Sequence, residues 1–423
     1  MKKKNNLTRI ALLLSLFLSA HATALAQRHE IFDSRVASLQ VTAGDDWMSI
    51  PVVTLGGEVP ILISFDDLTH EYHRYVYRVE HCEADWSVSE DLFISDFVEG
   101  FHDGVPIDDL QESLNTNVLY THYSLQIPNE RCRIKMSGNY RVTVYDENDG
   151  GKTILQACFM VVEPIAGVSM SVTTNTDIDI NNAHQQLNMQ VSYGRLNVTD
   201  PERQLKTVVM QNGRWDNAVM NAKPQFVMSD GLRWEHCRDL IFPGGNEYRK
   251  FEMLDVNRSS MGIDVIDWDG DHFHAYLWPD LPRPSYVYDE DANGSFQIRN
   301  SENYEIERTC EYLLVHFKLP SPIRYDGDIY LNGTWTNDQF SPAYRLEYDL
   351  PNQCYEAVVP LKQGYYSYQY LLMQADGSLI PLPSEGCFYQ TENDYQALVY
   401  YRGIGERTDR LVGYGKANSS RNR

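Results

Sequence analysis

The fold is decided by the stretch Tyr72-His-Arg-Tyr-Val-Tyr-Arg-Val-Glu-His-Cys82. Successive side chains of an extended strand point to opposite faces, which places Tyr75, Tyr77, Val79 and His81 together on one face. The other face carries two arginines, a valine and a glutamate. This alternation predicts a half-buried β-strand, because an amphipathic helix would repeat its apolar positions every three or four residues.

A second stretch, Gly138-Asn-Tyr-Arg-Val-Thr-Val-Tyr145, alternates in the same way and follows a Ser-Gly turn signal. Short strands of this kind recur over residues 27–164, separated by glycine and proline. Their number and spacing fit an immunoglobulin-like β-sandwich, although the Cys, Trp and Cys spacing of antibody domains is missing. The predicted fold class is all-β, with tandem immunoglobulin-like or early-set β-sandwich modules.

Two further sandwiches are predicted after this N-terminal module. The middle β-sandwich is expected over residues 165–300 and the C-terminal one over residues 301–402. In the latter, Leu331-Asn-Gly-Thr-Trp335 and Gly364-Tyr-Tyr-Ser-Tyr-Gln-Tyr370 resemble the early-set β-sandwiches related to glycogen-binding modules. Residues 403–423 are predicted to form a C-terminal extension that is partly disordered.

Residues 1–26 have the features of a secretory signal peptide. Basic residues precede a short apolar run, and cleavage is predicted after Ala26. The run falls short of the roughly 18 apolar residues that a membrane-spanning helix needs. Because Gln27 follows the cleavage site instead of a cysteine, no lipid attachment is expected. The mature chain is therefore expected to be exported, without direct membrane insertion.

The charge of the chain excludes nucleic acid as a partner. The formal net charge is −23, with 59 acidic and 36 basic residues, and removal of the basic signal peptide makes it more negative still. Proteins that bind nucleic acid need a basic surface. The acidic residues are dispersed, which favours a solvated surface, with an acidic face for a basic partner as the alternative.

Seven cysteines lie in the mature part of the chain. Their wide spacing excludes a zinc cluster of the CxxC type. The odd number leaves at least one thiol unpaired, and the sequence does not determine any pairing. Buried free thiols are expected for most of them, because a chain of this length does not need disulfides to be stable.

The sequence predicts no catalytic, cofactor-binding or metal site. A nucleophile elbow, a P-loop, a dinucleotide fingerprint and an HExxH helix are all missing, so no cofactor and no enzymatic activity are expected. The string Asp267-Trp-Asp-Gly-Asp271 resembles a calcium loop but lacks its final glutamate, which favours a hairpin turn. His272 and His274 follow it, without a third metal ligand nearby in the sequence.

The most distinctive stretch also contains the residue types of a cysteine–histidine dyad. His81, Cys82 and His122 are the residues that could form it. A catalytic thiol needs a base that a third group orients, and the sequence offers no such group. Satisfied core residues are therefore the preferred interpretation.

Five strings in the N-terminal module carry a family resemblance. They are HCEADW at residues 81–86, GF at 100–101, SLNT at 113–116, YTHYSL at 120–125 and SGNYRVTVYD at 137–146. In this order they resemble the type IX secretion system plug protein family of Bacteroidetes, formerly a domain-of-unknown-function family. GGNEYR and DANG, with first residues Gly244 and Asp291, continue the resemblance, which spans nearly the whole mature chain.

This resemblance implies a non-enzymatic periplasmic protein of the type IX secretion system. Such a protein binds the periplasmic opening of the outer-membrane translocon barrel and occludes it. The barrel is the implied partner, and the expected location is the periplasm, at the outer membrane through this partner, as a monomer within a complex. Loops of the first or third module are expected to make the contact, because loops carry most recognition in sandwiches.

The alternative function is that of an exported glycan-binding β-sandwich protein. Its candidate residue is Trp335 in the third module, whose indole could stack on a sugar ring. The same tryptophan could equally fill the core of the sandwich, and the core position is preferred.

Overall fold

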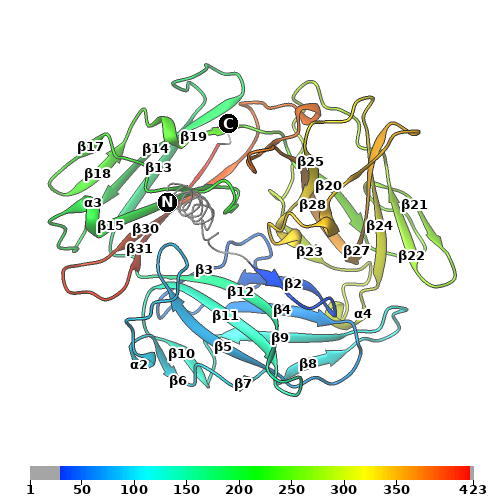
Figure 1. Ribbon diagram of the computed structural model, residues 1–423, viewed down its shortest axis with the longest axis horizontal. Helices are drawn as coiled ribbons and strands as arrows, with labels where there is room; N and C mark the ends of the chain where they lie inside the picture. Colours follow the sequence, from blue (N-terminus) through cyan, green and yellow to red (C-terminus); the bar gives the residue numbers. More distant parts are fainter. Residues whose placement is uncertain (1–28, 420–423) are drawn as a thin grey trace, which may run out of the picture.

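A computed structural model describes residues 29–419, which form three β-sandwiches arranged around a common centre (Figure 1). The predicted signal peptide, residues 1–26, lies outside the described residues. Strands dominate and helices are single short turns, so the predicted all-β class is confirmed. Within the described range, none of the helices has the length and apolar character that crossing a membrane requires.

The first sandwich, at the bottom of Figure 1, consists of two main sheets. One sheet has the order β1-β12-β11-β5-β7, with β3 beside β12, and its strands are β1 (Glu30–Ile31), β3 (Val52–Thr54), β5 (Tyr75–Cys82), β7 (Val105–Pro106), β11 (Gly138–Asp146) and β12 (Lys152–Val162). The other has the order β2-β4-β9-β8, with β2 (Val36–Ala43), β4 (Ile61–Asp67), β8 (Asp109–Glu112) and β9 (Thr121–Ile127). A small ribbon adds α2 (Ile94–Phe97), β6 (Val98–Gly100) and β10 (Cys132–Ile134).

The alternation of the deciding stretch is confirmed in β5 and β11. Tyr75, Tyr77 and Val79 of β5 are buried in the core between the two sheets, whereas Arg78 on the opposite face is exposed. The two strands pair antiparallel, with Tyr140 opposite His81. Paired strands that bury the same face are what the period of two predicted.

The second sandwich, at the upper left of Figure 1, combines strands from distant parts of the chain. One sheet contains β13 (Gly167–Thr173), β14 (His184–Ser192), β17 (Phe226–Val227), β18 (Gly231–Trp234) and β19 (Ile241–Pro243). The other has the order β16-β15-β30-β31, with β15 (Leu205–Gln211), β16 (Val219–Met220), β30 (Asp394–Tyr401) and β31 (Arg410–Asn418). Its two short helices are α3 (Pro201–Gln204) and a 3-10 turn at Arg238–Leu240.

The third sandwich, at the upper right, is formed by the chain between β19 and β30 (Figure 1). One sheet is centred on β28 and contains β20 (Arg249–Met253), β23 (Phe296–Ile298), β25 (Asp328–Asn332), β28 (Gly364–Met373) and β29 (Leu379–Pro381). The other has the order β21-β22-β24-β27-β26, with β21 (Ile263–Trp268), β22 (Phe273–Leu277), β24 (Tyr312–Pro320), β26 (Glu347–Asp349) and β27 (Cys354–Lys362). The helical turns are α4 (Ile306–Thr309) and Thr334–Thr336, Pro342–Tyr344 and Pro383–Glu385.

The structure corrects the predicted boundaries after residue 164. The range 165–300 includes β20 to β23, which pair within the third sandwich, and the range 301–402 includes β30, which pairs with β15 of the second. The extension predicted at 403–423 contains β31, which pairs with β30 along its whole length. The third sandwich is thus inserted into the second, because backbone pairing and burial join β15 to β30 despite their separation in sequence.

The first and second sandwiches share a hydrophobic interface. Cys158, Met160 and Val162 of β12 pack with Val208 of β15 and Leu398 of β30 in one buried cluster. The alternate residues of the same strands face their own sandwich cores. Strands buried on both faces have a continuous apolar sequence, which explains the run Cys158-Phe-Met-Val-Val162.

Candidate functional site

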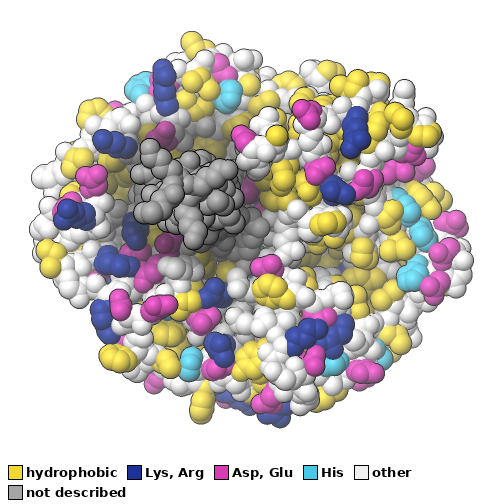
Figure 2. All heavy atoms as spheres, in the orientation of Figure 1, with side chains coloured by type: hydrophobic (Ala, Val, Ile, Leu, Met, Phe, Trp, Pro, Cys, Tyr) yellow, Lys and Arg dark blue, Asp and Glu magenta, His cyan; other side chains and the backbone are white. Residues whose placement is uncertain are grey.

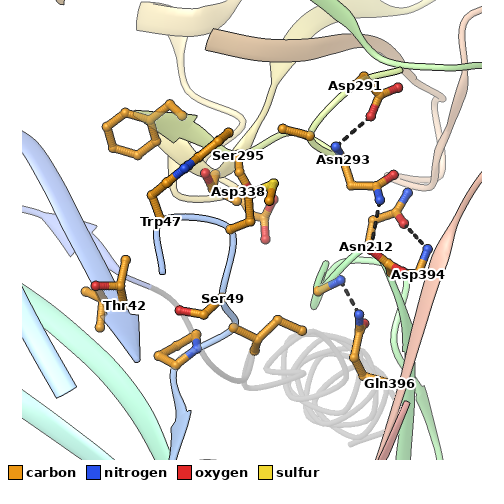
Figure 3. A pocket seen from close by; sticks show the side chains of 18 of the residues that line it. Thr42, Trp47, Ser49, Asn212, Asp291, Asn293, Ser295, Asp338, Asp394 and Gln396 are labelled. Atoms are coloured by element: carbon orange, nitrogen blue, oxygen red, sulfur yellow. Dashed lines mark hydrogen bonds between the residues drawn. The ribbon is translucent and has the colours of Figure 1, made fainter. Parts of the chain in front are cut away.

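A pocket lies where the three sandwiches meet, and it has a volume of about 370 Å³ (Figure 3). Trp47 and Ser49 reach it from the first sandwich, and Asn212 and Asp394 from the second. The third contributes its DANG turn at residues 291–294. The pocket therefore exists only when all three sandwiches are in place.

Hydrogen bonds and an aromatic contact hold the walls of the pocket together. The Asn293 amide donates to Asp394 Oδ2 at 2.9 Å, which links the third sandwich to the second. Within the second sandwich, the Asp394 backbone N–H donates to Asn212 Oδ1 at 2.8 Å. Across the junction of the first and third, the rings of Trp47 and Tyr365 meet edge to face at 5.7 Å. These contacts fix the shape of the pocket.

The pocket is acidic. None of the described residues that line it is a lysine or an arginine, and its carboxylates are Glu247, Asp289, Glu290, Asp291, Asp338, Glu392 and Asp394. Lys250 pairs with Asp289 at 2.7 Å and offsets part of this charge. Such a surface attracts positively charged or hydrogen-bond-donating groups and repels anions.

Two family strings, GGNEYR and DANG, meet at this pocket. Asp291 accepts hydrogen bonds from the backbone N–H groups of Tyr248 and Asn293. Asn293 and Gly294 have φ of 48° and 89°, and a Cβ on Gly294 would lie 2.9 Å from the Tyr248 ring. The DANG string thus forms a turn that packs against Tyr248 of the GGNEYR string.

Asp291 has a perturbed pKa. Burial raises the pKa of this carboxyl to about 7, and the nearby Glu247 charge adds to the effect. Burial also raises the pKa of Glu247. Shifts of this kind mark candidate functional positions, but here the carboxyl also holds a turn.

A buried polar cluster joins the first sandwich to the third. Asp66 accepts hydrogen bonds from Lys362 Nζ at 2.7 Å, the Tyr312 hydroxyl at 2.6 Å and His122 Nδ1 at 2.6 Å. Asp66 and Lys362 are at most 1% exposed. Burial opposes the ionised form of Asp66, but the Lys362 charge and His122 outweigh it and hold the pKa of this carboxyl below its usual range. The cluster is an ion pair that joins two sandwiches.

The HCEADW string joins the first sandwich to the second. Glu83 accepts hydrogen bonds from the Arg402 guanidinium and from the Asp409 backbone N–H, the latter at 2.9 Å. Asp409 in turn accepts from Ala84 N at 3.1 Å and from Lys206 Nζ at 2.7 Å. The string therefore serves the interface between sandwiches.

The interpretation of His81 and Cys82 as core residues is confirmed, since both are buried. His81 is buried and hydrogen-bonds to Ser89 Oγ at 2.9 Å. Burial raises the pKa of the Cys82 thiol to about 12, which disfavours a thiolate. A Cβ on Gly138 would lie 2.2 Å from His81 Nε2, so the imidazole requires the glycine of the SGNYRVTVYD string. His122 belongs to the Asp66 cluster.

The structure also shows where the other candidate residues from the sequence lie. Trp335 is 6% exposed and its indole N–H donates to the Ser367 carbonyl at 3.1 Å, so it is a core residue and cannot stack on a sugar. Asp267 and Trp268 end β21, and residues 269–272 form the tight turn to β22, as the hairpin interpretation predicted. No disulfide joins the cysteines within residues 29–419, and six of the seven are buried.

Three residues of types that can bind a metal lie close together at the end of β26 and the start of β27: Asp349, Cys354 and Glu356. The Cys354 thiol donates to Glu356 Oε1 at 3.3 Å, and burial followed by this hydrogen bond raises its pKa. Lys318 pairs with the same carboxylate at 3.0 Å. A protonated thiol beside a paired carboxylate is a poor metal site.

Comparison with solved structures supports the whole fold. The chain is similar over 93% of its length to a crystal structure at 2.30 Å resolution, titled as a hypothetical protein from Parabacteroides merdae ATCC 43184. The similarity covers 99% of that chain, with 38% sequence identity and a TM-score of 0.90. None of the curated proteins compared with this chain matches it.

A family model identifies the first sandwich. The model is described as the type 9 secretion system plug protein 1st domain, and it matches residues 36–163. This range runs from the first residue of β2 to one residue beyond β12 and includes the five strings of the resemblance. The first sandwich is therefore a type 9 secretion system plug protein 1st domain.

Proposed function

We propose that this protein is a non-enzymatic periplasmic component of the type IX secretion system that binds the periplasmic opening of the outer-membrane translocon barrel and occludes it. The observation that carries the proposal is the family match of the first sandwich. The predicted signal peptide agrees with an exported protein. The expected arrangement is a monomer held at the outer membrane by the barrel.

The contacts between the sandwiches suit a blocking role. A protein that seals an aqueous opening must keep its shape under the forces that the surrounding barrel exerts on it. The buried Asp66–Lys362 pair joins the first and third sandwiches, and a hydrophobic cluster joins the first and second. Interiors packed in this way have low compressibility, which supports occlusion by a rigid body.

Exposed apolar side chains in loops are candidate contacts with the barrel. Phe101 follows β6 in the first sandwich and is 67% exposed, and Leu350 in the turn after β26 of the third is 73% exposed. Ile180, between β13 and β14 of the second sandwich, is similarly exposed at 69%. Because loops of the first or third sandwich are expected to bind, Ile180 provides a matched control.

The test is an affinity pull-down of the tagged mature protein from solubilised outer membranes of its own organism. We expect the wild-type protein to recover a very large barrel protein, and Phe101→Ser or Leu350→Ser to recover several-fold less. Ile180→Ser should recover as much as the wild type. Wild-type protein that recovers no barrel would contradict the proposal, and a loss confined to Ile180→Ser would contradict the choice of surface.

The alternative glycan-binding function has lost its candidate residue, because Trp335 lies in the core of the third sandwich. Retention of the mature protein on a polysaccharide matrix, combined with failure to recover a barrel, would nevertheless favour that alternative over the plug.

A further inference from the structure

Two histidines and an aspartate meet on the outer face of the third sandwich. His274 Nδ1 lies 2.8 Å from His316 Nε2, and His274 Nε2 lies 3.0 Å from Asp269 Oδ2. Figure 2 shows histidine and acidic side chains gathered at the right-hand edge of the molecule, in the region of β21 and β22 in Figure 1. Both imidazoles are partly exposed. The cluster can therefore be reached from solvent.

Strand pairing explains why the two imidazoles meet. β22 and β24 are parallel neighbours, and His316 lies directly opposite Tyr276. His274 is two residues before Tyr276, so it is on the same face of the sheet. The Tyr276 ring stacks on His316 with centroids 4.2 Å apart. The sheet and this stacking hold the His316 ring beside His274.

The aspartate is fixed in position by the turn. Asp269 Oδ1 accepts hydrogen bonds from the backbone N–H groups of Asp271 and His272, both at 2.8 Å. Oδ2 is then directed at His274 Nε2, which must carry a proton to donate to the carboxylate. The neutral His274 ring therefore has its lone pair on Nδ1, on the side of His316.

The second imidazole distinguishes this cluster from the other histidine–carboxylate contacts of the described chain. In the described residues, His73, His122, His184, His236 and His272 each pair with a carboxylate at 2.6 to 3.1 Å, without a second histidine bonded to the ring. Within residues 29–419, only at His274 does the other side of such a ring face another imidazole nitrogen. A histidine oriented by a carboxylate, with its other nitrogen available, is the usual environment of a metal ligand.

We propose that this cluster binds a divalent transition-metal ion such as Zn²⁺ through His274 Nδ1 and His316 Nε2, with Asp269 orienting His274. Neutral imidazole suits Zn²⁺, Cu²⁺ and Ni²⁺. Zn–N bonds of about 2.0–2.1 Å place two tetrahedral ligands about 3.3 Å apart, so the rings must separate by roughly 0.5 Å. The proton that His316 Nε2 uses to bond His274 moves to Nδ1 of the same ring, and water completes the coordination.

The site was missed in the sequence because His316 lies 42 residues after His274. No ligand spacing joins them, and only the parallel pairing of β22 with β24 brings them together. The sequence prediction considered His272 and His274 without His316.

The test is calorimetric titration of the purified mature protein with Zn²⁺ alone. We expect one saturable site, and at least about tenfold weaker binding in His274→Ala and in His316→Ala. Asp269→Asn should weaken binding by about tenfold, because loss of the orienting carboxylate has that effect on metal sites. His236→Ala is the matched control, since His236 pairs with Asp177 at 2.9 Å without a second imidazole, and it should leave affinity unchanged.

Cu²⁺ electron paramagnetic resonance gives a second readout that does not depend on affinity. We expect the spectrum to show coupling to two imidazole nitrogens in the wild type and to one in each histidine variant, with thermal unfolding showing that the variants remain folded. Absence of saturable Zn²⁺ binding would overturn the proposal. So would unchanged affinity in a folded protein that carries both histidine substitutions.

Discussion

Asp66 is a buried charge at the contact between the first and third sandwiches. Its carboxylate accepts hydrogen bonds from Lys362, Tyr312 and His122. Both Asp66 and Lys362 are at most 1% exposed. We expect Asp66→Asn to lower the free energy of unfolding by about 3 to 5 kcal/mol, because Lys362 would keep its buried charge without a counter-charge. Chemical denaturation at pH 7 measures this loss.

A second substitution distinguishes the loss of the ion pair from the loss of side-chain packing. Lys362→Met removes the buried charge, so the double variant Asp66→Asn with Lys362→Met should be less destabilised than the sum of the two single variants by more than about 1 kcal/mol. Strict additivity would mean that the two side chains do not interact, in contradiction to the 2.7 Å contact.

Asp291 gives the stability a pH dependence of unusual sign. Its pKa is about 7 in the folded protein and near 3.8 in an unfolded chain, so between these values the folded state binds more protons. Stability therefore falls as pH rises from about 4 to 7. Asp291→Asn removes this carboxyl. The slope of the free energy of unfolding against pH should then change by about 1 kcal/mol per pH unit in this window. Denaturation profiles of wild type and variant that run parallel across this window would refute the assignment.

Individual side chains were predictable where a local pattern determines their environment. The alternation around Tyr77 is enough to place it in the core, and the absence of an orienting group was enough to reject a dyad at Cys82. Partners distant in sequence, such as Asp66 and Lys362, or His274 and His316, were not predictable, because only the tertiary fold brings them into contact.

At the scale of elements, β30 and β31 show why the module boundaries failed. The sequence Asp394-Tyr-Gln-Ala-Leu-Val-Tyr-Tyr401 predicts a buried strand wherever it pairs. Its hydrogen-bonded partner β15 lies nearly 200 residues earlier. The local pattern of residues does not indicate which strand is the partner. Strands were therefore predictable from sequence, whereas their assignment to the second or third sandwich was not.

The insertion makes the C-terminal strand essential to the second sandwich. β31 contributes the fully buried Leu411 and Val412. Asp409, just before it, accepts hydrogen bonds from Lys206 Nζ and from the Ala84 backbone N–H. A chain that ends at Tyr401 would expose two hydrophobic clusters, so we expect loss of the native fold of the second sandwich. Soluble yield and near-ultraviolet circular dichroism measure the effect.

A chain that ends at Ser419 is the control for this truncation. It keeps β31 and the hydrogen bond from the Ser419 hydroxyl to the Thr391 carbonyl at 2.8 Å, so its yield and spectrum should equal those of the full chain. If the chain ending at Tyr401 kept the same melting temperature as this control, β31 would be dispensable, and the second sandwich would be stable without it.

At the scale of the whole molecule, the three sandwiches are joined by contacts of the kind found inside domains. The first shares a hydrophobic cluster with the second and a buried ion pair with the third, and Asn293 links the third to Asp394 of the second. The chain also passes twice between the second and third sandwiches because of the insertion. Separate unfolding of one sandwich would therefore expose apolar surface and buried charge on its neighbours.

We accordingly expect the mature protein to unfold in a single calorimetric transition, with the calorimetric enthalpy equal to the van't Hoff enthalpy. Asp66→Asn weakens one of the three contacts and should broaden this transition or divide it, with the first sandwich separating from the third. Ile180→Ser, which touches none of these contacts, should keep the single transition. Two or more resolved transitions in the wild type would show that the sandwiches are independent, and rigid occlusion would then need another source of stiffness.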